Sequence, residues 1–157
     1  MKNQKEVMEL AAELHKGQTR EDGIEPYVNH PLRVSTLYQE YTWSSNQIMI
    51  ALLHDTIEDC GVTEDDLVMK HGVPPAVAMG VAMLSRVKDE SYVDFIHRIG
   101  KSFKSMRDIK IADIKDNLRN HKKSSRRDKY ELALALLQSY GDLEEKTTVI
   151  LNVLKQK

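Results

Sequence analysis

A run of six consecutive apolar residues, 48–53, places the strongest constraint on how this chain folds. A helix that is apolar on every side is buried nearly all round, so the run predicts a helix at the centre of the molecule. It ends directly at His54 and Asp55, which therefore emerge from the core rather than from a solvated face. Because buried polar groups need partners, these two side chains indicate a functional site at the end of the buried helix.

Two more carboxylates follow within one helical turn. If the helix continues, Glu58 lies one turn beyond His54 and Asp59 lies one turn beyond Asp55, so that an imidazole and several carboxylates converge on one side. Such a concentration of buried polar groups is costly without a compensating cation. The segment therefore predicts part of a metal site, whose remaining ligands come from elsewhere in the chain.

Composition limits the size, the partners and the location of the protein. A chain of 157 residues with 41% hydrophobic residues predicts one domain, spanning 1–157, with a substantial core. The 23 basic residues nearly balance the 24 acidic ones, and a net charge of -1 disfavours nucleic acids and membrane surfaces as partners. The sequence has no membrane-length apolar run, no signal peptide and only one cysteine, so we expect a cytoplasmic protein without disulfides.

The periodicity of the chain is helical throughout, with no alternating strand pattern of useful length. We therefore expect an all-α bundle. Asn29 is expected to cap a helix that carries His30 and Pro31 in its first turn. The expected helices are 3–16, one from Asn29, one from Ser44 to the break at Gly61, 63–72, one from Pro74 through 84, 89–99, one from Ser105 through 118, and two that flank Gly141.

Two side chains outside the central segment are candidate ligands. His30 lies in the first turn of one expected helix, and Asp113 lies within another. Taken alone, such a histidine is more often a capping or hydrogen-bonded residue, and a single helical aspartate is usually solvated. Together with the adjacent His54–Asp55 pair, they indicate a set of nitrogen and oxygen ligands.

Four blocks of sequence carry a family resemblance. They are Ala12 to Gln18 with Arg20, Glu25 to Pro31, Ala51 to Asp59, and Lys110 to Asp113 leading to Asn117-Leu118-Arg119. In this order they resemble the HD superfamily of metal-dependent phosphohydrolases, and within it the hydrolase domain of the RelA/SpoT alarmone proteins. The resemblance extends from about Ala11 to Leu137, and it implies an HD-domain helical bundle.

The resemblance also implies a metal centre and a pair of catalytic carboxylates. Its four metal ligands are His30, His54, Asp55 and Asp113. The family implies Mn²⁺, although two imidazoles and two carboxylates also suit another divalent transition metal. Glu58 and Asp59 are implied to assist the attack of water on a 3′-pyrophosphate. Their position near a helix end, where negative charge opposes the helix dipole, likewise favours a catalytic role over a structural one.

Substrate contacts follow from the same blocks. The family uses the arginine that matches Arg20 to hold the nucleotide. Lys110 lies one turn before Asp113 and Asn117 one turn after it. Either both line the same cavity, with Lys110 toward phosphate and Asn117 toward base or ribose, or they are surface residues. Glu21 departs from the family, which commonly has lysine there, so the contact expected at that position is lost or reversed in charge.

A basic cluster follows the last block. It is either a solvated linker or a group that gathers a polyphosphate near the site. Tyr130, just beyond it, is expected to be packed rather than catalytic. The cluster comprises Arg119, Lys122, Lys123, Arg126, Arg127 and Lys129.

The resemblance therefore implies a stand-alone small alarmone hydrolase that converts (p)ppGpp to GDP or GTP and pyrophosphate. Its expected partner is a small nucleotide, and the pattern indicates neither an oligomeric state nor a protein partner. Two alternatives remain open at this point: an HD phosphohydrolase that acts on another nucleoside mono- or diphosphate, and a nucleotide-binding regulator that turns nothing over.

Overall fold

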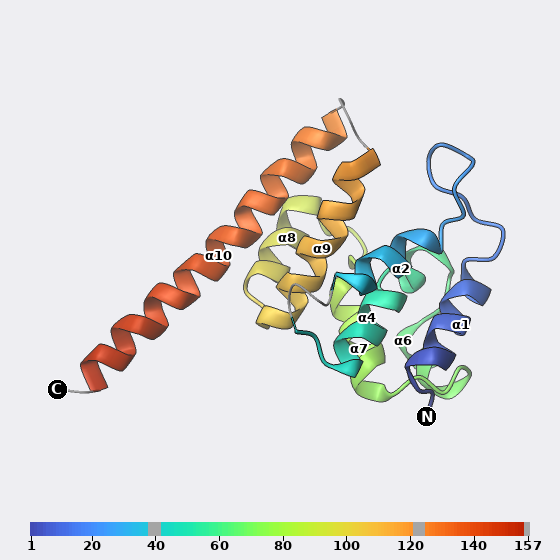
Figure 1. The fold of residues 1–157 in the computed structure, drawn as a ribbon, viewed down its shortest axis with the longest axis horizontal. Helices are drawn as coiled ribbons and strands as arrows, with labels where there is room; N and C mark the ends of the chain where they lie inside the picture. The colour runs from blue at the N-terminus through green and yellow to red at the C-terminus, as the bar shows by residue number, and fades with distance from the viewer. Residues whose placement is uncertain (38–41, 121–124, 156–157) are drawn as a thin grey trace.

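All regular structure in the computed structural model, which describes residues 1–37, 42–120 and 125–155, is helical (Figure 1). The only ladder contact outside the helices of this described part is an isolated antiparallel bridge between Thr19 and Pro26. The all-α prediction is confirmed. The helices are α1 (Gln4–Leu14), α2 (Asn29–Thr36), α4 (Ser45–Leu53), α5 (Thr56–Asp59), α6 (Glu64–Met69), α7 (Pro75–Leu84), α8 (Tyr92–Gly100), α9 (Lys104–Asn120) and α10 (Ser125–Lys155).

Helix α4 forms the centre of the fold, as its apolar run predicts. Every residue from Ile48 to Leu53 is buried, and α4 packs against α1, α2, α7 and α9. The helix begins with the capping box expected from its sequence: the Gln47 backbone N–H donates to Ser44 Oγ, and the Ser44 backbone N–H donates to Gln47 Oε1. The central helix therefore delivers its C-terminal end to the interior of the bundle.

The helix expected to run on to Gly61 is interrupted at His54 and Asp55. α4 ends at Leu53 and the short α5 begins at Thr56, so these two residues form the junction between them. Side chains contact backbone carbonyls in the last turn of α4. The Thr56 hydroxyl donates to the Leu53 carbonyl at 2.7 Å, and His54 Nδ1 lies 2.8 Å from the Ala51 carbonyl. The register expected of one continuous helix is therefore broken where the metal-binding side chains emerge.

Helices α8, α9 and α10 form the other part of the bundle. The first half of α10 lies along α8 and α9, and its C-terminal end projects beyond them (Figure 1). The prediction of two helices flanking Gly141 is wrong, because α10 runs through this glycine without a break. Arg126, Arg127 and Lys129 lie on α10 rather than in a linker, whereas Lys122 and Lys123 lie outside the described residues.

Two helix starts differ from those expected. α8 begins at Tyr92 rather than near Asp89, because Asp89 has a left-handed backbone (φ 63°) and Ser91 caps the helix by accepting from the Asp94 backbone N–H. Asn29 is the first residue of α2 and not its cap, which is Val28. His30 still lies in the first turn of α2, as expected.

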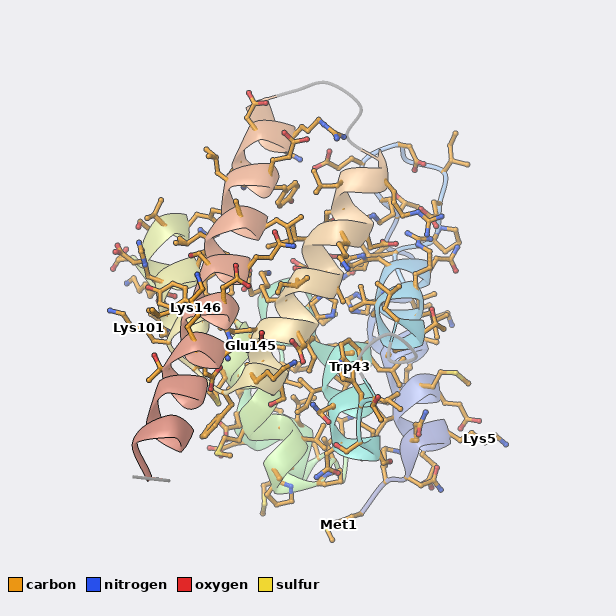
Figure 2. All side chains as sticks on the ribbon, turned by 60° about the vertical axis from the view of Figure 1, so that its left-hand side comes forward. Met1, Lys5, Trp43, Lys101, Glu145 and Lys146 are labelled. Carbon is orange, nitrogen blue, oxygen red and sulfur yellow. The ribbon has the colours of Figure 1, made fainter. Side chains whose placement is uncertain are left out.

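Charged side chains surround this apolar interior. Lys5 and Lys101, labelled in Figure 2, are exposed and lie at the periphery of the molecule, whereas Trp43, just before α4, is buried. In the described part of the chain, no helix combines the length and the apolar character needed to cross a membrane.

Two glycines provide a matched test of the packing between α8 and α10. A Cβ on Gly100 would clash with the ring of Tyr140, whereas a Cβ on Gly141 would meet nothing within 4 Å. We expect Gly100→Ala to lower the free energy of unfolding by about 1–3 kcal/mol through overpacking. Gly141→Ala is expected to raise it by about 0.5–1 kcal/mol, since alanine favours a helix interior. Denaturant unfolding measures both, and equal effects of the two variants would contradict this packing.

Candidate metal centre

Three segments bring the candidate ligands together. α2 carries His30, the junction between α4 and α5 carries His54 and Asp55, and α9 carries Asp113; these helices pack directly on one another. His30 Nε2 lies 3.1 Å from Asp113 Oδ1 and 3.5 Å from Asp55 Oδ2. His54 Nε2 lies 3.2 Å from Asp55 Oδ2 and 3.6 Å from Asp113 Oδ1. The four residues predicted from distant parts of the sequence thus meet at one point.

The donor atoms at this point fit a cation. One ligand atom each from His30, His54 and Asp55 lies within 4.8 Å of the others. His54 Nε2 is buried and forms no hydrogen bond with any of the described residues. A buried ring nitrogen that lies close to two carboxylates without forming an aligned hydrogen bond is the arrangement expected of a metal ligand. The donor set of imidazole nitrogen and carboxylate oxygen suits a divalent transition metal.

The electrostatics of the cluster favour positive charge. Burial works against a charged imidazole at His54, but the Asp55 carboxylate and contact with Asp113 outweigh it and raise the pKa of His54 to about 10. The pKa of His30 is also raised, because its hydrogen bonds with Asp113 and Asp116 overcome the effect of burial. The negative potential that holds protons on these rings is the potential that attracts a divalent cation, which binds imidazole in its neutral form.

The cluster lies at one wall of a cavity of about 430 Å³, a size that suits a small-molecule ligand. Helices α5, α8, α9 and α10 and the loop before α2 all contribute to its lining. The lining residues are Thr19, Arg20, Glu21, Tyr27, Asp55, Glu58, Asp59, Arg86, Tyr92, Phe95, Lys110, Asp113, Asn117, Lys129 and Tyr130.

Glu58 and Asp59 both lie on the wall of this cavity, beside the cluster. Glu58 Oε1 accepts a hydrogen bond from the Arg86 backbone N–H at 2.7 Å, which fixes one end of its carboxylate. The Asp59 backbone carbonyl accepts from Gln18 Nε2 at 3.0 Å, which ties α5 to the loop before α2. Two solvent-accessible carboxylates are therefore held next to the candidate ligands, where they can exchange protons with a bound molecule.

The predicted substrate residues are tied to the cluster itself. Lys110 Nζ pairs with Asp113 Oδ2 at 2.7 Å and lies 4.9 Å from the centre of the Phe95 ring. Asn117 Nδ2 donates to Asp113 Oδ1 at 2.6 Å, and Asn117 Oδ1 accepts from Arg20 Nη2 at 2.6 Å. Lys110 and Asn117 therefore orient Asp113, and Asn117 connects it to Arg20 at the cavity wall.

Tyr27 is a contact of the cluster that the sequence did not identify. Its hydroxyl donates to Asp55 Oδ2 at 2.8 Å, and its ring stacks on His15 with centroids 4.8 Å apart. Burial and the charges of Asp55 and Asp59 raise the pKa of Tyr27, so its hydroxyl stays a donor. Its place in the block Glu25 to Pro31 was the available signal, because that block also contains His30.

Arg86 and the aromatic wall were likewise not predicted as site residues, whereas Lys129 belongs to the basic cluster for which a polyphosphate-gathering role was one of two interpretations. Lys129 Nζ lies 4.3 Å from the centre of the Tyr92 ring and 5.1 Å from that of Tyr130. Burial lowers the pKa of Lys129, and the charges of Arg126, Arg86 and Lys110 lower it further. Cations that destabilise one another at a cavity wall indicate a place for an anion. Tyr130 lines this cavity as well as packing against the core.

Glu21, which departs from the family pattern, lies at the cavity and forms an ion pair with Arg126 of α10. Both side chains are more than half exposed. The negative charge at this position therefore engages a cation of the predicted basic cluster.

Comparisons with known proteins agree with this geometry. Residues 8–149 match the family model of the HD domain. A guanosine-3′,5′-bis(diphosphate) 3′-pyrophosphohydrolase of Vibrio cholerae is 41% identical over 80 residues, which cover 50% of this chain and 11% of that protein. A GTP pyrophosphokinase of Myxococcus xanthus is 31% identical over 150 residues, which cover 88% of this chain and 20% of that protein.

A solved structure shares the fold. It is a metazoan ortholog of SpoT described as hydrolysing ppGpp, with a TM-score of 0.72 and 28% identity, and the match covers 87% of this chain and 84% of that one. The curated relatives are much longer, since the chain spans only 11% and 20% of the length of the two named above.

Proposed function

The chain belongs to the HD-domain family, and from this premise we propose that it is a Mn²⁺-dependent (p)ppGpp 3′-pyrophosphohydrolase. The observation that carries the proposal is the convergence of His30, His54, Asp55 and Asp113 at the wall of a cavity that is also lined by cations and aromatic rings. The names of the Vibrio cholerae relative and of the metazoan structure support the same reaction.

These four side chains are the residues that would hold the cation. When bound, it would lower the pKa of water and polarise a phosphoryl oxygen. Tyr27 holds Asp55 through its hydroxyl, while Lys110 and Asn117 hold Asp113. The contacts to both carboxylates fix their oxygens toward the histidine rings, which reduces the reorganisation needed on binding.

Glu58 and Asp59 are proposed to move the protons. In the reaction, water attacks the phosphorus attached to the 3′ oxygen, the bond between them breaks, and the proton lost by water is balanced by one gained at the leaving 3′ oxygen. The two carboxylates lie side by side on the cavity wall, where one can accept a proton and later return it. The Arg86 backbone contact orients Glu58 for this role.

The cationic and aromatic walls suit a nucleotide with several phosphates. Arg86 and Lys129 offer charge to phosphoryl oxygens, and Tyr92 and Tyr130, over whose rings Lys129 lies, add aromatic surface to the same wall. Arg20, which lies 5.4 Å from the centre of the Tyr27 ring, is oriented by Asn117 at the same wall. This lining favours a polyphosphorylated nucleotide over a monophosphate.

A panel of nucleotides with Mn²⁺ tests the proposal. We expect ppGpp and pppGpp to release pyrophosphate, with GDP and GTP as the other products. Nucleoside mono- and diphosphates are expected to release neither phosphate nor pyrophosphate at a comparable rate. Release of inorganic phosphate from a simple nucleotide, with ppGpp unchanged, would instead establish the alternative of an HD phosphohydrolase with another nucleotide substrate.

Glu21, which departs from the family pattern, is the reason to test for another nucleotide substrate. Because Glu21 engages Arg126, we expect Glu21→Gln to release the charge of Arg126 toward a bound polyphosphate. An exposed ion pair contributes about 0–1 kcal/mol, so the expected gain is a fall of about two- to fivefold in the KM for ppGpp, with kcat unchanged. Steady-state kinetics measure it, with Glu13→Gln on the exposed face of α1 as the control. An unchanged or higher KM would show that Glu21 does not oppose the phosphates.

A further inference from the structure

Asp116 is a buried carboxylate that contacts the back of the candidate metal centre. Only 2% of its surface is exposed, and its Oδ2 lies 2.7 Å from His30 Nδ1. The other ring nitrogen of His30, Nε2, faces Asp113 and Asp55. Asp116 therefore holds His30 from the side opposite the metal-binding nitrogen.

Arg33 holds Asp116 in turn. Arg33 Nε donates to Asp116 Oδ1 at 2.7 Å and Nη2 donates to Oδ2 at 2.9 Å, so the guanidinium grips both carboxylate oxygens. The third donor, Nη1, pairs with Glu25 in the loop before α2. Because His30 and Arg33 are three residues apart on α2, they share one face of the helix and reach the same carboxylate.

The two histidines of the centre are oriented in different ways. His54 directs its Nδ1 to the Ala51 carbonyl one turn earlier, which is a local contact within the chain. His30 directs its Nδ1 to a charged side chain on α9, which is a contact between two helices. A carboxylate partner raises the basicity of an imidazole ligand more than a carbonyl does, because its full negative charge stabilises the ring N–H.

We infer that Asp116 is a positioning residue for the metal centre, holding His30 with the proton on Nδ1 so that Nε2 is available as a ligand, and that Arg33 fixes Asp116 in this role. The inference rests on the proposed metal centre. Neither Asp116 nor Arg33 was identified from the sequence as part of the site. Because Asp116 lies on α9 and holds His30 on α2, the inference also makes metal affinity depend on the packing of these two helices.

Asparagine at position 116 separates this role from simple packing. It has nearly the same shape, but one carboxylate oxygen becomes an N–H₂ donor. If that donor faces His30, it favours the tautomer with the proton on Nε2; if it faces Arg33, two donors oppose each other. Either orientation therefore disrupts the contact of residue 116 with His30 or with Arg33, while the side chain still fills the same space.

The test is the affinity of purified protein for Mn²⁺ alone, measured by competition with a chromophoric chelator. We expect Asp116→Asn to weaken Mn²⁺ binding about 10–100-fold. The matched control is Asp108→Asn, which alters a buried aspartate of the same helix that pairs with Lys104 away from the centre. The control is expected to bind Mn²⁺ like the wild type. Equal affinities of Asp116→Asn and the wild type would overturn the inference.

A second measurement needs no variant, and it decides the matter if Asp116→Asn does not fold. NMR of the ring nitrogens of the wild type loaded with diamagnetic Zn²⁺ reports the tautomer of His30. A proton on Nδ1 with Nε2 as the ligand supports the inference, whereas ligation through Nδ1 or a proton on Nε2 overturns it. Failure of the wild type to bind either metal would refute the metal centre itself, which is a different outcome from a variant that binds normally.

Discussion

Asp55→Asn is expected to abolish Mn²⁺-dependent release of pyrophosphate from ppGpp. Asp55 lies 3.2 Å from His54 Nε2 and 3.5 Å from His30 Nε2, so the amide replaces a charged oxygen at the centre of the ligand set with a neutral group. A catalytic cation supplies several kcal/mol of transition-state stabilisation, and losing about 4 kcal/mol corresponds to a fall of about 10³-fold in kcat/KM. Initial rates of pyrophosphate release at saturating Mn²⁺ measure the effect.

The control for Asp55→Asn is Asp65→Asn, because Asp65 is exposed on α6 and lies outside the cavity lining. This variant is expected to retain wild-type kcat/KM. Circular dichroism establishes that both variants keep their helices. A folded Asp55→Asn protein with wild-type activity would contradict the assignment of Asp55 as a ligand.

Glu58→Gln is expected to reduce kcat about 10²–10⁴-fold while leaving Mn²⁺ affinity within about twofold of the wild type. Glutamine keeps the oxygen that accepts from the Arg86 backbone N–H, so the side chain stays in place and only its capacity to hold a proton is lost. Asp59→Asn tests its neighbour in the same way, because Asp59 also lines the cavity. Single-turnover rates and Mn²⁺ competition measure the two quantities separately.

The outcome that contradicts proton transfer by this pair is specific. If Glu58→Gln and Asp59→Asn each retain wild-type kcat, neither carboxylate moves a proton in the rate-limiting step. If instead Mn²⁺ affinity falls together with kcat, the affected carboxylate contributes to metal binding rather than to proton transfer.

The part of the site best predicted from the sequence is the part set by local pattern. The apolar run 48–53 requires burial on all sides, and the structure confirms that α4 is the central helix with His54 and Asp55 at its end. His30 and Asp113 lie in two of the blocks that carry the family resemblance, and the structure brings both to the same point. Burial therefore predicted where the site begins, and the resemblance implied which residues meet there.

The details that the sequence did not predict depend on how helices pack. Helical periodicity does not reveal the interruption between α4 and α5, where the side chains of His54 and Thr56 lie at carbonyls of the preceding turn. The continuity of α10 through Gly141 is a tertiary effect too, since its preceding turns are held against α8 and α9. A glycine in open space is tolerated in such a helix.

Asp116 and Arg33 show why supporting residues escape sequence analysis. Each looks like an ordinary charged position on an amphipathic helix, and their relation appears only when α2 and α9 are side by side. Lys129 was predicted within a basic cluster, but its position over the Tyr92 ring depends on where α10 lies against α8. Contacts between distant segments were therefore the missing information, rather than residue types.

The most direct test of the central claim is a titration of Mn²⁺ into metal-free protein while pyrophosphate release from ppGpp is followed. Because His30, His54, Asp55 and Asp113 form a single cluster, we expect the rate to rise in proportion to bound metal and to level off at one Mn²⁺ per chain. Chelation is expected to abolish the activity, and renewed addition of Mn²⁺ to restore it. Pyrophosphate release that continues without metal, or Mn²⁺ binding at this stoichiometry without any release, would contradict the claim.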